Sequence, residues 1–204
     1  MTDGAERIGI VGGTFDPIHL GHVELAEAAR RCARLDRVLL IPAGVPPHRH
    51  RPVASDADRL AMCRLAVRHH PNLEASDREL RRGGPSYTLQ TLVELQRAYP
   101  GAGLFLVLGW DAARDLPTWH EPQQVLRLAT LVVLPRPGLA PPTAADLREA
   151  GVDPARTLLC RPGTPDVGAT DLRRRLRSGA EPDGLLDPAV LAYIREHHLY
   201  EETD

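Results

Sequence analysis

The chain has 204 residues, of which 43% are hydrophobic and 25% are charged, as expected for one globular domain with a full core. Its formal net charge of −2 argues against non-specific nucleic-acid binding, and no apolar run is long enough to span a membrane. We therefore expect a single domain over residues 1–204 and no nucleic-acid or membrane partner. Since no signal peptide is recognisable, we expect a cytoplasmic location and reduced thiols at Cys32, Cys63 and Cys160.

Apolar runs and amphipathic stretches alternate along the chain. The apolar runs predict strands at residues 7–12, 37–42, 104–108, 131–134 and 158–160, with a weaker one at 73–75. The amphipathic stretches and their capping residues predict helices at residues 20–34, 55–69, 87–98, 122–128 and 144–150, and closing helices at 170–177 and 188–197. This alternation is typical of an α/β protein with a doubly wound parallel sheet. Ligands of such sheets bind beyond the carboxyl ends of the strands.

The first predicted strand runs directly into a glycine turn and then into a helix. Glycines allow a close approach of backbone to an anion, and a helix N-terminus supplies free N–H groups and a favourable dipole, so this arrangement is typical of a phosphate site. His19 and His22 lie three residues apart at the helix start and can share one side. Two imidazoles beside a phosphate can stabilise charge that develops during phosphoryl or nucleotidyl transfer. A zinc site would need further ligands, and no third one is apparent nearby.

Residues 13–22 read GTFDPIHLGH, which resembles the HxGH signature of a nucleotidyltransferase superfamily. Within this superfamily, the motif is most similar to that of the bacterial nicotinate-mononucleotide adenylyltransferases. The resemblance implies a Rossmann-like nucleotidyltransferase fold and contacts of Gly13, Thr14 and Phe15 with ATP. It also implies that His19 and His22 support the transfer of AMP, with Mg²⁺ accompanying ATP.

Four further segments carry the resemblance. Residues 46–49 are similar to a family Pro-Pro-His-Lys segment whose basic residue faces phosphates, which assigns His48 and Arg49 to substrate binding. The Ser-Tyr-Thr motif assigns Tyr87 and Thr88 to the pyridine nucleotide, although the residues by themselves indicate only a helix start. Arg136, after a later strand, is assigned to the same substrate.

The last two segments concern ATP and the pyridine ring. Gly109 and Asp111 match family residues at the adenosine part, whereas Trp110 stands where the family usually has a small residue. Trp119 suits stacking on an electron-poor pyridinium, or else plugs the edge of the core. Residues 168–173 match a family helix start that holds ATP phosphates: Thr170 is assigned to ATP and Arg173 to catalysis. Gly168 and Ala169 replace two family serines.

The implied function is transfer of AMP from ATP to nicotinate mononucleotide, giving deamido-NAD and pyrophosphate in NAD biosynthesis. Alternative acceptors within the superfamily are nicotinamide mononucleotide and phosphopantetheine. Because two family serines are replaced, a nucleotide-binding protein with weak catalytic activity is a further alternative. A dehydrogenase is disfavoured because Ile41 and Pro42 stand where an acidic residue is expected after the second strand. The sequence does not determine the oligomeric state, and a homo-oligomer is one possibility.

Overall fold

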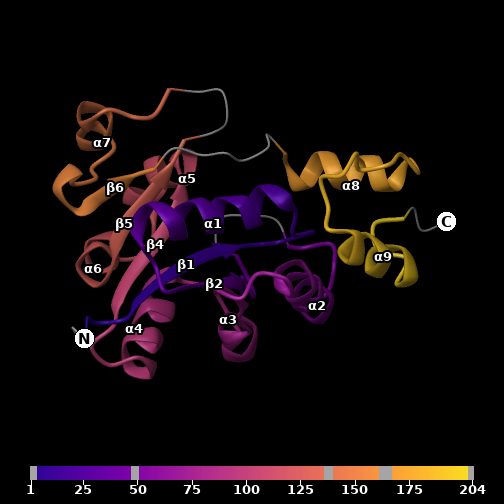
Figure 1. Cartoon of the computed structure of the whole chain (residues 1–204), viewed down its shortest axis with the longest axis horizontal. Coiled ribbons are helices and arrows are strands. Elements are labelled where there is room, and N and C mark those ends of the chain that lie inside the picture. Colours follow the sequence, from indigo (N-terminus) through magenta and orange to yellow (C-terminus); the bar gives the residue numbers. More distant parts are fainter. Residues whose placement is uncertain (1–3, 47–50, 136–139, 161–166, 202–204) are drawn as a thin grey trace.

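The computed structural model describes residues 4–46, 51–135, 140–160 and 167–201. In these residues a six-stranded, wholly parallel sheet has the order β3-β2-β1-β4-β5-β6 (Figure 1). The strands are β1 (Arg7–Gly13), β2 (Arg37–Pro42), β3 (Leu73–Ala75), β4 (Gly103–Gly109), β5 (Thr130–Leu134) and β6 (Thr157–Leu159). The order runs outward in both directions from β1 and β4, which is the Rossmann arrangement of a doubly wound sheet. The predicted fold class is confirmed.

Helices cover both faces of this sheet. One buried apolar layer contains residues of α1 (Leu20–Ala33), α2 (Asp56–Val67), α8 (Ala169–Arg177) and α9 (Pro188–Glu196). The layer on the other face contains residues of α4 (Thr88–Ala98), α5 (Trp110–Asp115), α6 (Pro122–Leu128) and α7 (Ala144–Glu149). A short helix α3 (Arg78–Arg82) and two 3₁₀ turns, η1 (Leu116–Thr118) and η2 (Pro154–Arg156), complete the described elements.

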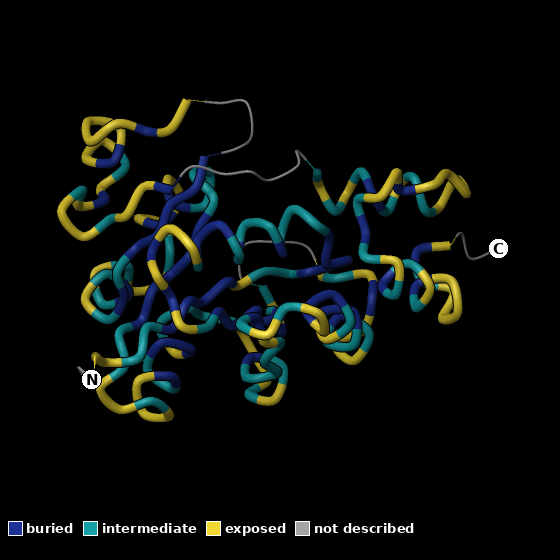
Figure 2. The backbone as a smooth tube through the Cα atoms, in the orientation of Figure 1, coloured by how far each residue is buried: buried dark blue, intermediate teal, exposed yellow. Residues whose placement is uncertain are grey.

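The strands read as continuous apolar runs because both of their faces are buried. In β4, Leu104, Leu106 and Leu108 belong to one apolar layer, whereas Phe105 and Val107 belong to the other. Figure 2 shows the resulting distribution, with buried backbone through the centre and exposed backbone in the outer helices and turns. Because successive side chains of a strand point to opposite faces of the sheet, one apolar run contributes residues to both apolar layers.

All predicted strands and helices lie within two residues of the observed bounds, and the structure adds two short α-helices that the sequence patterns do not predict, α3 and α5. The last strand covers Thr157–Leu159 and ends one residue before the predicted end. The segment after β4, for which no helix is predicted, begins with the helix α5, and Gly109 is the N-cap of this helix. Trp110 and Asp111 therefore stand in a helical first turn. Among the described residues, no helix combines the length and hydropathy needed to cross a membrane.

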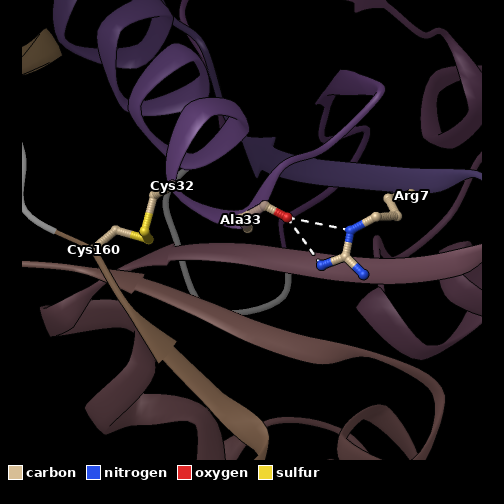
Figure 3. Close-up of a disulfide and its surroundings, with 4 residues drawn as sticks. All are labelled: Arg7, Cys32, Ala33 and Cys160. Atoms are coloured by element: carbon tan, nitrogen blue, oxygen red, sulfur yellow. Dashed lines mark hydrogen bonds between the residues drawn. A yellow bond between two sulfur atoms is a disulfide. The ribbon is translucent and has the colours of Figure 1, made fainter.

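The prediction of three reduced cysteines is wrong for two of them. Cys32 in α1 and Cys160 after β6 form a disulfide with a Cα–Cα distance of 6.0 Å (Figure 3). They are 128 residues apart in the sequence, and only the course of α1 across the sheet brings them together, so their spacing carries no signal. Cys63 is free and buried, and burial raises the pKa of its thiol.

The disulfide fixes the C-terminal end of α1, which a second group also holds. The Arg7 guanidinium donates hydrogen bonds to Ala33 O, at 3.3 Å from Nε and 2.9 Å from Nη2 (Figure 3). Its Cζ lies 4.2 Å from the centre of the Phe105 ring. Since the last carbonyls of a helix lack partners within the helix, a guanidinium there supplies donors and favourable charge.

Candidate active site

The central strands β1 and β4 separate before they end. Their pairing stops at Ile10 and Leu106, although the strands continue to Gly13 and Gly109. Gly12 is exposed although it lies in a central strand, and a Cβ atom built on Gly12 or Gly109 would meet no heavy atom within 4 Å. The carboxyl ends of β1 and β4 therefore border open space at the point where the strand order reverses, as is usual for ligand sites in such sheets.

The two motif histidines stand at the start of α1. His19 is the N-cap residue of this helix, and its backbone N–H donates to His22 Nδ1 at 3.3 Å. The two rings are stacked, with centroids 3.7 Å apart and planes inclined by 24°. The spacing of three residues thus places both imidazoles on one side, as predicted from the sequence.

His19 is 6% exposed, and this burial lowers its pKa from 6.5 to about 4 because desolvation disfavours the charged imidazole. The ring is therefore neutral at pH 7. Its Nδ1 atom is buried, and among the described residues it has no hydrogen-bond partner. A Cβ atom on Gly21 would lie 2.8 Å from Val167 Cγ1 and 3.1 Å from His19 Nδ1, so the glycine of the motif leaves room for the imidazole.

Phe15, which the resemblance assigns to ATP, has a buried side chain. Its ring is 2% exposed and meets the His22 ring edge-on, at a centroid distance of 4.9 Å. The side chain thus packs against His22 and is closed to solvent. Gly13 and Thr14 stand next to it; a Cβ atom on Gly13 would lie 3.0 Å from Phe15 Cε1.

Buried polar groups hold the turn between β1 and α1. Arg59, which is fully buried, donates from Nη1 to Thr14 O at 2.7 Å and from Nη2 to Asp56 Oδ1 at 2.6 Å. The Asp16 carboxylate accepts from the backbone N–H groups of Val53 and Ala54 at 2.8 and 3.1 Å. It also accepts from the Tyr200 hydroxyl at 2.8 Å. Sequence reasoning missed the contribution of these side chains.

The helix α8 reaches the same turn. Arg173 Nη1 donates to Asp16 O at 2.6 Å, and Nη2 donates to Thr170 Oγ1 at 3.3 Å. The helix begins after Gly168, on which a Cβ atom would meet nothing within 4 Å. The predicted pair Thr170 and Arg173 therefore lies beside the motif. Both terminal nitrogens of Arg173, Nη1 and Nη2, already donate to oxygen atoms of the protein.

A second group of predicted residues gathers around the start of α4, for which Tyr87 is the N-cap. Ser86 Oγ accepts from Gly44 N at 2.8 Å, which ties the stem of the segment after β2 to the Ser-Tyr-Thr motif. The Tyr87 ring lies 4.4 Å from the His120 ring, and Thr88 is the first residue of α4. Trp119, next to His120, is partly buried against the apolar layer of α4, α5 and α6.

The remaining predicted residues are less informative. Asp111 forms an ion pair with Arg114 at 3.1 Å. His48, Arg49 and Arg136 lie outside the described residues. Within the described ranges, no group of three or more His, Cys, Asp or Glu side chains could hold a metal ion.

Known proteins resemble this chain in sequence. A family model described as Cytidylyltransferase-like matches residues 10–175. A relative from Synechococcus sp. strain JA-3-3Ab, named "Probable nicotinate-nucleotide adenylyltransferase", is 43% identical over 196 residues, covering 95% of this chain and 94% of the relative. A protein of the same name from Roseiflexus sp. strain RS-1 is 45% identical over 194 residues, covering 95% of this chain and 97% of the relative.

The fold is shared with more distant proteins. A solved structure of Plasmodium falciparum nicotinic acid mononucleotide adenylyltransferase complexed with NaAD superposes with a TM-score of 0.79 at 16% identity, covering 96% of this chain and 97% of that one. The same enzyme complexed with APC gives a TM-score of 0.77 at 15% identity, with the same coverage. At these identities the likeness shows that the fold is shared.

Proposed function

The chain belongs to the cytidylyltransferase-like family and, within it, to the nicotinate-nucleotide adenylyltransferases, and we propose that it transfers AMP from ATP to nicotinate mononucleotide. The products are deamido-NAD, used in NAD biosynthesis, and pyrophosphate. The observation that carries the proposal is the stacked His19–His22 pair at the N-terminus of α1, beside the opening between β1 and β4.

The chemistry needs little from the protein beyond alignment and charge stabilisation. A phosphate oxygen of nicotinate mononucleotide attacks the α-phosphorus of ATP, the bond from that phosphorus to the bridging oxygen breaks, and pyrophosphate leaves. The attacking oxygen is already anionic, so the reaction requires neither a protein nucleophile nor a general base. Holding the two phosphates in line, with donors aimed at the charge that develops, supplies the rate enhancement.

His19 and His22 are the donors that we assign to the transferring phosphoryl group. A neutral imidazole carries one N–H, so His19 can donate without being charged. A bound triphosphate would favour the protonated form, and we expect ATP to raise the pKa of His19 from its low value in the free protein. Arg173 completes this set, because its guanidinium lies at the motif turn and stays charged at every physiological pH.

The two substrates are proposed to bind to two different groups of residues. ATP contacts the motif turn, the end of β4 and the start of α8 through Gly13, Thr14, Phe15, Gly109, Asp111 and Thr170. The mononucleotide contacts the other group, consisting of His48, Arg49, Tyr87, Thr88, Trp119 and Arg136. The link between Gly44 and Ser86 and the contact between Tyr87 and His120 support a common site for the second group.

Mg²⁺ enters as part of the substrate in this proposal, bound to triphosphate oxygens. When bound, it neutralises charge on the phosphates and helps to orient them. In this proposal the chain contributes hydrogen-bond donors around the phosphates, from the motif turn and from the start of α8.

Acceptor choice is the experiment that tests this function. Purified protein with ATP and Mg²⁺ is given nicotinate mononucleotide, nicotinamide mononucleotide and phosphopantetheine in parallel, and kcat/KM is measured from pyrophosphate release. We expect the highest value with nicotinate mononucleotide. Preference for phosphopantetheine would reassign the acceptor, and binding of ATP without turnover by any acceptor would leave a nucleotide-binding protein.

We also propose that residues 1–204 act as one nucleotidyltransferase domain and that the protein works in the cytoplasm, where ATP and pyridine mononucleotides are formed. The Cys32–Cys160 disulfide is unusual for a reducing compartment. Alkylation of free thiols at the moment of cell lysis, followed by peptide mass mapping, measures how much of this bond exists in the cell.

A further inference from the structure

Tyr200 follows α9 and points into the protein. Its side chain is 4% exposed and lies in the same apolar layer as α1, α2 and α8. The backbone reaches this position through two left-handed residues, His198 with φ of +50° and Tyr200 with φ of +69°. Neither is glycine, so both conformations are strained. Such strain persists only where the surroundings enforce it, and it is concentrated at functional sites.

The contact that accompanies this conformation is made with the HxGH motif. The Tyr200 hydroxyl donates to Asp16 Oδ1 at 2.8 Å, across 184 residues of sequence. Burial, and next the negative charge of Asp16, raise the pKa of Tyr200, so the hydroxyl keeps its proton and remains a donor. In Figure 1, α8 and α9 lie together at the end of the molecule toward which β1 runs.

Asp16 is the point where four parts of the chain meet. It stands three residues before His19, is 3% exposed, and accepts from Val53 N and Ala54 N as well as from Tyr200. Arg173 Nη1 lies 3.8 Å from Asp16 Oδ2. A buried carboxylate depends on each of its partners. Without the Tyr200 hydroxyl, Asp16 Oδ1 would keep the longer hydrogen bond from Ala54 N, at 3.1 Å.

We propose that Tyr200 is a positioning residue for adenylyl transfer: its hydrogen bond to Asp16 fixes the turn that carries His19 and His22. The residue touches neither substrate and acts through Asp16. Asp16 also couples the motif to Val53 and Ala54, which follow in sequence the residues assigned to the mononucleotide. The inference rests on the proposed function, because its kinetic consequence is read in adenylyl transfer.

The chain offers a matched control. Tyr193 in α9 also donates its hydroxyl to a carboxylate, at 2.9 Å from Asp58 Oδ1 in α2. This pair joins α9 to α2 and does not include the motif turn. Tyr193→Phe and Tyr200→Phe each remove one hydroxyl that donates to a carboxylate, so only a positioning role predicts different kinetics.

The experiment measures kcat, both KM values and the thermal midpoint for the wild type, Tyr200→Phe and Tyr193→Phe. We expect Tyr200→Phe to lower kcat about tenfold, as for the loss of one hydrogen bond to a charged group, while both KM values stay within about twofold. Tyr193→Phe should keep the kcat of the wild type. Combining Tyr200→Phe with Asp16→Asn should lower kcat by less than the product of the single effects, since both changes act on one bond.

Imidazole NMR signals give a readout that does not depend on turnover. In the ATP-free protein, the His19 and His22 signals should shift in Tyr200→Phe and stay in place in Tyr193→Phe. Equal kcat in the two variants with unshifted signals would overturn the proposal and leave Tyr200 as a packing residue. If the wild type shows no adenylyl transfer but the His19 and His22 signals still shift in Tyr200→Phe, the proposed function is refuted and the contact between Tyr200 and the motif is supported.

Discussion

The buried neutral state of His19 makes the stability of the protein depend on pH. The pKa of His19 falls from 6.5 to about 4 in the folded protein because the ring is desolvated. Between these values the unfolded chain binds a proton that the folded chain does not, so the free energy of unfolding decreases as the pH falls. For this one group, the decrease between pH 7 and pH 5 amounts to about 2 kcal/mol.

Urea unfolding at pH 7, 6, 5, 4 and 3 checks this value, with His19→Asn compared with the wild type. The wild type should lose about 2 kcal/mol more than the variant between pH 7 and pH 5, and the difference should level off below pH 4. His69→Asn, at an exposed position after α2, controls for the loss of one imidazole. Equal pH dependence in the wild type and His19→Asn, or an NMR titration of His19 with a midpoint near 6.5, would refute the reasoning.

Four further predictions concern other parts of the molecule. Replacing both Cys32 and Cys160 by serine should lower the free energy of unfolding by about 2–4 kcal/mol, and a dithiol should bring the wild type to the same value; three alkylatable thiols in the oxidised protein would contradict this. His22→Ala should lower kcat by roughly a hundredfold, as for other charge-stabilising donors, and activity within a few-fold of the wild type would reassign the residue to structure. Trp119→Ala should raise KM for the mononucleotide by roughly tenfold through lost stacking, and a larger change in KM for ATP would contradict the assignment. Arg173→Ala should lower kcat/KM for ATP more than Thr170→Ala, because the guanidinium is the charged partner; a silent Arg173→Ala would leave this segment a capped helix.

Much of the fold follows from local patterns. The apolar runs predict the six strands, and their alternation with amphipathic helices predicts the parallel, doubly wound sheet. These features depend on neighbouring residues, which the sequence displays directly. The helix α5 escapes prediction because its signal is short: it has six residues and a glycine N-cap, and it follows directly after a strand.

The site is predicted in part. The sequence spacing predicts that His19 and His22 share one side, which their stacking confirms, whereas the groups that hold the motif depend on contacts distant in sequence. Arg59 has a detectable signal, since it shares one face of α2 with Met62, Cys63 and Ala66, all of them buried. A charged residue at such a position needs a buried partner. Tyr200 and the Cys32–Cys160 pair carry no local signal, because only the complete fold brings their partners within reach.

The most direct test of adenylyl transfer follows oxygen atoms through the reaction. Nicotinate mononucleotide with ¹⁸O at all three non-bridging phosphate oxygens is incubated with ATP, Mg²⁺ and the protein. Mass spectrometry then measures the number of ¹⁸O atoms in each product. Attack of the mononucleotide phosphate on the α-phosphorus predicts deamido-NAD that keeps all three labelled oxygens, together with an equal amount of unlabelled pyrophosphate. Labelled pyrophosphate, or folded protein that forms no dinucleotide, would contradict the account.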